Sequence, residues 1–339
     1  MQKYKLIINA PFINTGGGKV LLDKLLKNIT PSKKILVILD RRLKYNNEIS
    51  HVKILQSSKN PFNYFLNELY LFFHSSHQTR VMCLHNLPVF FKNPGFVSVY
   101  LHNKLYLSRK NSFFSLGKIK NYFFTKSLFF CDEIIVQTPA MKNELQTFLE
   151  NKFINKPIVQ LPFFDTKDLI LRKMPIKYDF IYVADGSLHK NHQNLLKAWI
   201  ILAQENIRPS IVLTLGISDN LLLEEINAKS KIYNLKIYNF SNLGRSDINN
   251  LYCSCKALIF PSFVESFGLP LLEATFHKLK ILAPELDYVR DVCNPDFTFD
   301  PTSPFSIASS VKRSLNIPNV KLEIFSPEYF LRFVSSKRK

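Results

Sequence analysis

Short apolar runs alternate with helix-length segments along the first half of the chain. The runs lie at residues 5–9, 35–39, 52–55, 81–84, 97–101, 133–137 and 158–161. They are rich in β-branched residues and mostly lack polar alternation, which is typical of parallel strands buried on both faces. The pattern predicts a doubly wound α/β domain.

The same alternation returns in the second half, with further strands expected at residues 180–183, 210–215, 237–240, 257–260 and 281–283. Residues 152–177 contain three prolines and little periodicity, so we place the connection between two domains there. We expect a first domain over residues 1–165, a second over 166–318, and a C-terminal helix with a basic tail over 319–339. A length of 339 residues agrees with two domains.

Composition narrows the choice of partners and compartment. The net charge of +19 favours an anionic partner: a phosphorylated substrate, an acidic membrane face or nucleic acid. Five cysteines without a repeated CxxC do not make a disulfide framework, which fits a reducing cytoplasm. No apolar stretch reaches the ~20 residues that a spanning helix needs, and residues 5–8 lack the long apolar region of a signal peptide. We therefore expect a soluble or peripheral protein.

The most informative stretch is residues 261–274, PSFVESFGLPLLEA, which follows the apolar run 257–260. Glu265 and Glu273 are separated by seven residues, and a tight turn between them opens into a helix with Pro270 in its first turn. Free N–H groups at a helix N-terminus attract phosphate. Two carboxylates beside such a pocket indicate a sugar nucleotide, with one carboxylate for sugar hydroxyls and one for ribose. The alternative is that Glu273 only favours the helix dipole from a first turn and Glu265 is a solvated loop residue.

Two other loops join a strand to a helix. Gly16, Gly17 and Gly18 follow the first strand and allow a ligand to approach the backbone, although the run is neither a P-loop nor GxGxxG. Lys190 stands in a glycine-containing loop after the strand at 180–183, where a lysine can neutralise a diphosphate. The alternative for Lys190 is a solvated position at a helix start.

His-Asn pairs follow two strands of the first domain, His85-Asn86 and His102-Asn103. Residues past the carboxyl ends of parallel strands lie at the ligand-binding edge of the sheet. An imidazole there could hydrogen-bond a sugar hydroxyl or polarise the reacting centre, or it could only satisfy loop carbonyls. The chain has no Asp-x-Asp and no His/Cys cluster with metal spacing, so we expect no metal site.

Together these motifs resemble GT4-type glycosyltransferases (glycosyl transferases group 1) of the GT-B fold, whose signature is Glu, seven residues, Glu after a Pro-Ser. The resemblance covers residues 179–299 well and the first domain loosely. The HKNHQNLLKAW segment is similar to bacterial polysaccharide and O-antigen cluster enzymes. The resemblance implies two Rossmann-like domains facing a cleft and a retaining hexosyltransferase without a cofactor. The donor would be a UDP- or GDP-sugar, and the acceptor a lipid-linked glycan in surface polysaccharide (lipopolysaccharide) synthesis.

The resemblance also implies residue roles. Glu265 and His102 would lie at the catalytic centre, Lys190 would hold the diphosphate and Glu273 the ribose. Further donor-binding positions would be Gly186, Phe267, Gly268, Leu269, Asn242, Leu243 and Gly16, Gly17 and Gly18. The sequence departs from the family at Asn103, which usually is Asp, and at Asp185, where many members carry Arg. In the family a C-terminal helix often crosses back to the first domain, which residues 328–334 would do here.

Residues 109–130 combine many phenylalanines with Lys118, Lys120 and Lys126. Such a mixture is typical of a helix at a membrane interface, or of a core helix whose lysine stems reach solvent. We expect a peripheral protein on an anionic membrane, at the inner face of the cytoplasmic membrane. Rival functions are a basic nucleic-acid-binding protein, for which no recognisable motif is present, and an inactive GT-B-like protein. We expect no nucleic-acid partner.

Overall fold

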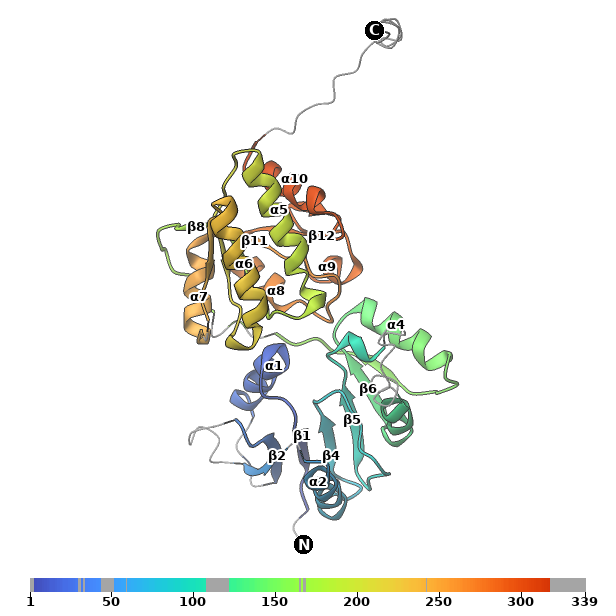
Figure 1. Ribbon diagram of the computed structural model, residues 1–339. Helices are drawn as coiled ribbons and strands as arrows, with labels where there is room; N and C mark the ends of the chain where they lie inside the picture. Colours follow the sequence, from blue (N-terminus) through green and yellow to red (C-terminus); the bar gives the residue numbers. More distant parts are fainter. Residues whose placement is uncertain are drawn as a thin grey trace, which may run out of the picture.

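The computed structural model describes residues 3–29, 32, 34–43, 52–58, 60–107, 122–164, 166, 169–241 and 243–317. These residues form two parallel sheets, each with helices on its faces (Figure 1). The expected C-terminal helix over residues 319–339 lies outside the described residues. In the described part of the chain, no helix has the length and apolar character that crossing a bilayer would require.

The first sheet has the strand order β3-β2-β1-β4-β5-β6-β7. Its strands are β1 (Leu6–Ala10), β2 (Ile35–Asp40), β3 (Lys53–Ser57), β4 (Arg80–Cys83), β5 (Phe96–Tyr100), β6 (Glu133–Val136) and β7 (Ile158–Gln160). Its helices are α1 (Gly16–Lys27), α2 (Pro61–His74) and α4 (Pro139–Glu150), with short 3-10 turns η1 (Lys104–Tyr106) and η2 (Leu128–Phe130). The strand order reverses between β1 and β4, which is where ligands bind in such sheets.

The second sheet has the order β10-β9-β8-β11-β12-β13. Its strands are β8 (Tyr178–Tyr182), β9 (Ile211–Leu213), β10 (Ile237–Asn239), β11 (Cys255–Ile259), β12 (Lys280–Pro284) and β13 (Phe297–Phe299). Its helices are α5 (His192–Gln204), α6 (Asn220–Tyr233), α7 (Arg245–Cys253), α8 (Leu269–Phe276), α9 (Asp287–Arg290) and α10 (Pro304–Ser314), with η3 (Leu188–Lys190) and η4 (Ile217–Asp219). The order reverses between β8 and β11.

Every strand expected from the sequence is present, with its ends within two residues of the expected ones. Burial on both faces holds for the central strands and is wrong for the edge strands β3, β7 and β10, where for example Ile54, Val159 and Tyr238 are exposed. The reason is position, because an edge strand lacks a neighbour on one side. The apolar residues of β3 did not indicate from the sequence that this strand lies at the edge of the sheet.

The two domains touch at defined points. Lys104 N, after β5, donates a hydrogen bond of 2.7 Å to Ser266 Oγ in the loop after β11. Ala140 N, in the first turn of α4, donates to Asp291 Oδ2 at 2.8 Å. In Figure 1, α1 and α4 lie on the side of the first domain that faces the second. We propose the domain boundary at 165/166, between β7 and β8.

Candidate active site

A cleft of about 1240 Å³ separates the two domains and is lined by residues of both. It lies at the carboxyl ends of strands in both parallel sheets, so the loops that follow β1, β4 and β5 face those that follow β8, β9 and β11. It brings together predicted residues that are far apart in sequence: Gly16, Gly17, Gly18, His102, Lys190, Leu243, Glu265, Phe267, Gly268, Leu269 and Glu273. Asn242 lies outside the described residues.

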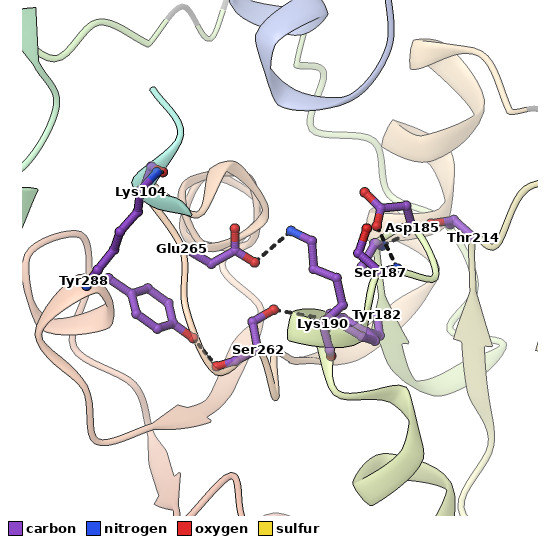
Figure 2. A network of polar contacts seen from close by, with 11 residues as sticks. Lys104, Tyr182, Asp185, Ser187, Lys190, Thr214, Ser262, Glu265 and Tyr288 are labelled. Atoms are coloured by element: carbon purple, nitrogen blue, oxygen red, sulfur yellow. Dashed lines mark hydrogen bonds and ion pairs between the residues drawn. The ribbon is translucent and has the colours of Figure 1, made fainter. Parts of the chain in front are cut away.

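Lys190 and Glu265 form an ion pair in this cleft. Lys190 Nζ lies 2.7 Å from Glu265 Oε1, and the two side chains are only 16% and 12% exposed. Figure 2 shows them pointing toward one another from separate loops. The solvated alternatives for both residues are therefore wrong, because each is held by the other in a partly buried place.

The backbone around Lys190 is fixed by Asn191, which sequence reasoning did not single out. Asn191 adopts φ 62°, a left-handed conformation that asparagine tolerates better than most residues. Its buried Nδ2 donates to the carbonyl oxygens of Pro261 at 2.9 Å and Pro301 at 2.7 Å. The side chain therefore ties the Lys190 loop to the start of the Glu265 loop. The feature of the sequence that could have identified Asn191 is that an asparagine directly follows Lys190 in a turn.

Two buried tyrosines complete this support. Tyr182 Oη, at the end of β8, donates to the carbonyl oxygen of Lys190 at 2.7 Å and lies 3.0 Å from Ser262 Oγ. Tyr288 Oη donates to the carbonyl oxygen of Ser262 at 2.7 Å. Burial raises the pKa of both phenols, which keeps them neutral donors. The Pro-Ser of the motif thus serves as the anchor between the lysine loop and the glutamate loop (Figure 2).

Glu273 is the fifth residue of α8 and is 2% exposed. The first-turn dipole alternative is wrong, because α8 has no acidic residue in its first turn. Glu273 Oε1 instead lies 2.5 Å from Nη2 of Arg245, the first residue of α7. Arg245 also lines the cleft, and nothing in its local sequence marked it. Only the fold brings α7 and α8 close enough for this pair.

The start of α8 presents a helix N-terminus to the cleft, as the sequence predicted. Gly268 is its N-cap with φ 70°, and a Cβ there would lie 2.9 Å from Leu271 Cδ1. Gly268, Leu269 and Pro270 all line the cleft. The positive end of the helix dipole therefore faces the same space as Lys190.

On the opposite wall, His102 is held in one tautomer. Its Nε2 lies 2.8 Å from the carbonyl oxygen of Leu84, which can only accept, and 3.2 Å from Asn86 Nδ2; the shorter contact assigns the proton to Nε2. Its backbone N–H donates to Asn86 Oδ1 at 2.7 Å. Burial lowers the pKa of His102, so the ring is neutral at pH 7 and its Nδ1 keeps a lone pair.

His85 takes the alternative role considered for these histidines, which is to satisfy nearby polar groups. Its Nδ1 lies 3.1 Å from the carbonyl oxygen of Asn9, and its Nε2 lies 2.9 Å from Tyr64 Oη. Burial lowers the pKa of His85 to about 4. This residue satisfies polar groups under the cleft floor, although it still contributes to the lining.

The three glycines of the loop after β1 differ in how a side chain would fit at each position. Gly16 needs its positive φ of 66°, whereas a Cβ on Gly18 would lie 2.8 Å from His102 Cε1. A Cβ on Gly17 would lie 3.5 Å from Leu269 Cδ1 of the second domain, an ordinary contact across the cleft. Gly18 is therefore the glycine that allows His102 to take its place.

Gly186 lies behind the cleft wall, while its neighbours Asp185 and Ser187 line it. A Cβ on Gly186 would lie 2.7 Å from Asp219 Oδ1, so this glycine serves close packing. Burial pushes the pKa of Asp185 upward, but hydrogen bonds from Ser187 outweigh it and leave the pKa lowered. The wall therefore carries a carboxylate where an arginine was expected. Among the described residues, no three His, Cys, Asp or Glu side chains are grouped to hold a metal ion.

The second domain is similar to known glycosyltransferases. Residues 167–324 match the family described as glycosyl transferases group 1. A stretch of 154 residues, 44% of the chain, is 28% identical to the serotype-specific mannosyltransferase WbdA of Escherichia coli. That stretch spans only 19% of WbdA, so the likeness concerns a small part of that protein.

Solved structures extend the likeness to both domains. Anabaena Alr3699/HepE in complex with UDP and glucose has a TM-score of 0.63 at 14% identity, covering 91% of this chain and 89% of that one. Sucrose-phosphate synthase from Thermosynechococcus elongatus has a TM-score of 0.69 at 14% identity, covering 93% and 90%. At such identities the match establishes the fold, which is GT-B with two parallel α/β domains.

Proposed function

We propose that this chain, a GT4-type glycosyltransferase by the family of its second domain and by its GT-B architecture, transfers a sugar from a UDP- or GDP-sugar to a lipid-linked glycan with retention at the anomeric carbon. The observation that carries the proposal is the placement of Lys190, Glu265 and Glu273 on one wall of the cleft. This wall offers a cation for phosphate and carboxylates for hydroxyls.

The donor would enter by exchanging partners. Its diphosphate takes the ammonium of Lys190 and the N-terminus of α8, since both attract negative charge. Glu265 is thereby released from its ion pair and can accept hydrogen bonds from the sugar hydroxyls. Glu273 keeps Arg245 on Oε1 and has a second oxygen for the ribose hydroxyls.

The same groups would stabilise the reaction. When the bond between the anomeric carbon and the diphosphate oxygen breaks, negative charge develops on that oxygen, where Lys190 and the helix dipole already stand. The acceptor oxygen bonds to the anomeric carbon on the face that the diphosphate leaves, and its proton goes to the leaving phosphate. On the other wall the neutral imidazole of His102 can accept a hydrogen bond at Nδ1.

The acceptor and the place of action follow from the relatives and the charge. WbdA is by its name a serotype-specific mannosyltransferase, and Alr3699/HepE is described with UDP and glucose. These support a nucleotide sugar donor and surface polysaccharide synthesis. A lipid-linked acceptor remains in the membrane, and the net charge of +19 suits the anionic inner face of the cytoplasmic membrane.

The first test measures the affinities of UDP, GDP, uridine and guanosine for the parent and for Lys190→Ala. We expect the diphosphates to bind roughly ten to a hundred times more weakly to the variant, because a charge-assisted contact is worth about 1.5–3 kcal/mol. The nucleosides should bind equally to both. Lys256→Ala is the matched control, since Lys256 is an exposed lysine of the same domain and is paired with Asp179. Unchanged diphosphate affinity in Lys190→Ala would remove Lys190 from the donor site.

The second test concerns the transfer itself. The purified chain should transfer sugar from the bound nucleotide sugar to a polyprenyl-diphosphate-linked glycan, and the anomeric proton of the product should show retention by NMR. An inverted product would refute the stereochemistry. Donor binding without transfer to any lipid-linked glycan would support the inactive alternative.

A further inference from the structure

Helix α2 turns apolar side chains toward solvent and polar ones toward the core. Its outward residues Phe62, Phe65, Leu66 and Phe73 are between 45% and 66% exposed, and we call them the α2 apolar face. Residues 62, 66 and 73 are four and seven positions apart, so they lie on one side of the helix. The helix therefore carries apolar residues on both sides, since Tyr64 and Leu71 are buried in the core.

The polar residues of α2 point the other way. Glu68 is 1% exposed, and its Oε2 accepts a hydrogen bond of 3.0 Å from Phe90 N. Asn67 is also buried and donates to Ser57 Oγ. Burial raises the pKa of Glu68, the only acidic residue of this helix. The α2 apolar face thus presents rings and a leucine to solvent, and no carboxylate.

Ring contacts lead from α2 to a second exposed aromatic patch. The Phe90 ring lies 4.9 Å from that of Tyr64 on α2 and 6.5 Å from that of Phe123. Phe123 and its neighbour Tyr122 are both more than half exposed, on the helical residues 122–127. Because Tyr64 lies on the buried side of α2, Tyr122 and Phe123 form a second exposed aromatic patch of the first domain, on the second half of the segment that the sequence marked as aromatic and basic. Residues 108–121 of that segment, with Lys118 and Lys120, lie outside the described residues.

A lysine stands beside each of the two patches. At the C-terminal end of α2, Lys3 Nζ donates to the carbonyl oxygens of Phe73 and Ser75, each at 2.8 Å. In the second patch, Lys126 Nζ lies 5.7 Å from the centre of the Tyr122 ring. Exposed rings with cations at their margin are typical of contact with a lipid interface, where rings enter the acyl boundary and cations meet headgroups.

We propose that the α2 apolar face, together with Tyr122 and Phe123, docks the first domain on an anionic lipid bilayer. This rests on the proposed function, because a lipid-linked acceptor is reached only at the bilayer. A second copy of the chain fits the surface less well, since two chains of +19 would meet with their lysines facing one another. An anionic bilayer is complementary to both the rings and the cations.

The test is flotation of the full-length protein with vesicles of phosphatidylcholine and phosphatidylglycerol, and with vesicles of phosphatidylcholine alone. The variant combines Phe62→Ser, Leu66→Ser and Phe73→Ser, which leaves the buried side of α2 intact. We expect stronger binding of the parent to the anionic vesicles, and a loss of about tenfold for each apolar side chain removed. Phe305→Ser and Leu221→Ser are matched controls, because both residues are highly exposed apolar positions of the second domain.

Nucleotide affinity in solution separates this proposal from the proposed function. If the triple variant binds UDP or GDP like the parent but no longer floats, the docking surface is supported. If it floats like the parent, the docking proposal is wrong whatever the donor measurements show. If instead the parent sediments as a dimer and the variant as a monomer, with equal flotation, the surface joins two copies and the bilayer is excluded as its partner.

Discussion

Asn191 offers a quantitative test of how the lysine loop is built. In Asn191→Ala the side chain loses its hydrogen bonds to Pro261 and Pro301. At about 0.5–1.5 kcal/mol for each bond, this removes roughly 1–3 kcal/mol. A left-handed residue with φ 62° costs alanine about 1–2 kcal/mol more. The sum predicts a loss of about 2–5 kcal/mol.

A second substitution separates the two contributions. Asn191→Gly loses the same hydrogen bonds but accepts the positive φ, so it should be less destabilising than Asn191→Ala by about 1 kcal/mol. Asn234→Ala is the control for the backbone alone. Asn234 is exposed, has φ 51° and ends α6 far from the lysine loop. It should cost about 1 kcal/mol and leave nucleotide affinity unchanged.

The assay uses the single tryptophan of the chain. Trp199 is buried in the core of the second domain, so its fluorescence during urea unfolding reports on that domain. Titration with UDP and GDP measures the functional effect, because a loosened lysine loop should weaken diphosphate binding in both Asn191 variants. The reasoning fails if Asn191→Gly unfolds at the parent's urea concentration and binds both diphosphates as tightly. Equal stability of Asn191→Ala and Asn191→Gly would refute the backbone argument alone.

Two further predictions follow from packing and burial. Gly18→Ala should slow sugar transfer more than it weakens donor binding, because the added Cβ would lie 2.8 Å from His102 Cε1. Gly17→Ala should change transfer little, because its Cβ would lie 3.5 Å from its nearest neighbour. Steady-state kinetics of both variants checks this prediction. Burial raises the pKa of Glu68 from 4.5 to about 7, so its protonated form is the one that the fold favours. Its contribution to stability is full below pH 4.5 and is lost as pH rises through 7, by roughly 3 kcal/mol. Urea unfolding of Glu68→Gln from pH 4.5 to 8 should show a correspondingly smaller decline than the parent; parallel curves for the two proteins would contradict the assignment.

The sequence was most informative where a single local pattern determines the structure. Parallel strands buried on both faces need continuous apolar runs, and these runs located the observed strands from β1 to β12. Pro270 predicted the start of α8, because proline suits a first helical turn. The resemblance implied donor-binding roles for Lys190, Glu265 and Glu273, and all three line the cleft.

Contacts between segments that are distant in sequence could not be predicted from such local patterns. The ion pair of Arg245 with Glu273 joins the first turn of α7 to the second turn of α8, and its arginine lies in no recognisable motif. The edge position of β3 and the outward apolar face of α2 likewise depend on which elements cover them. Apolar residues look alike in sequence whether they face a core or solvent.

The sequence by itself therefore determined the elements, their parallel arrangement and the residue types that meet at the ends of the strands, because each follows from periodicity, turn chemistry or a contiguous motif. Tertiary structure alone decided which charges pair, which polar groups each histidine contacts and why Gly18 must be small. Those properties depend on distances between segments as far apart in the chain as Gly18 and His102, and only the packing of the sheets and helices sets such distances.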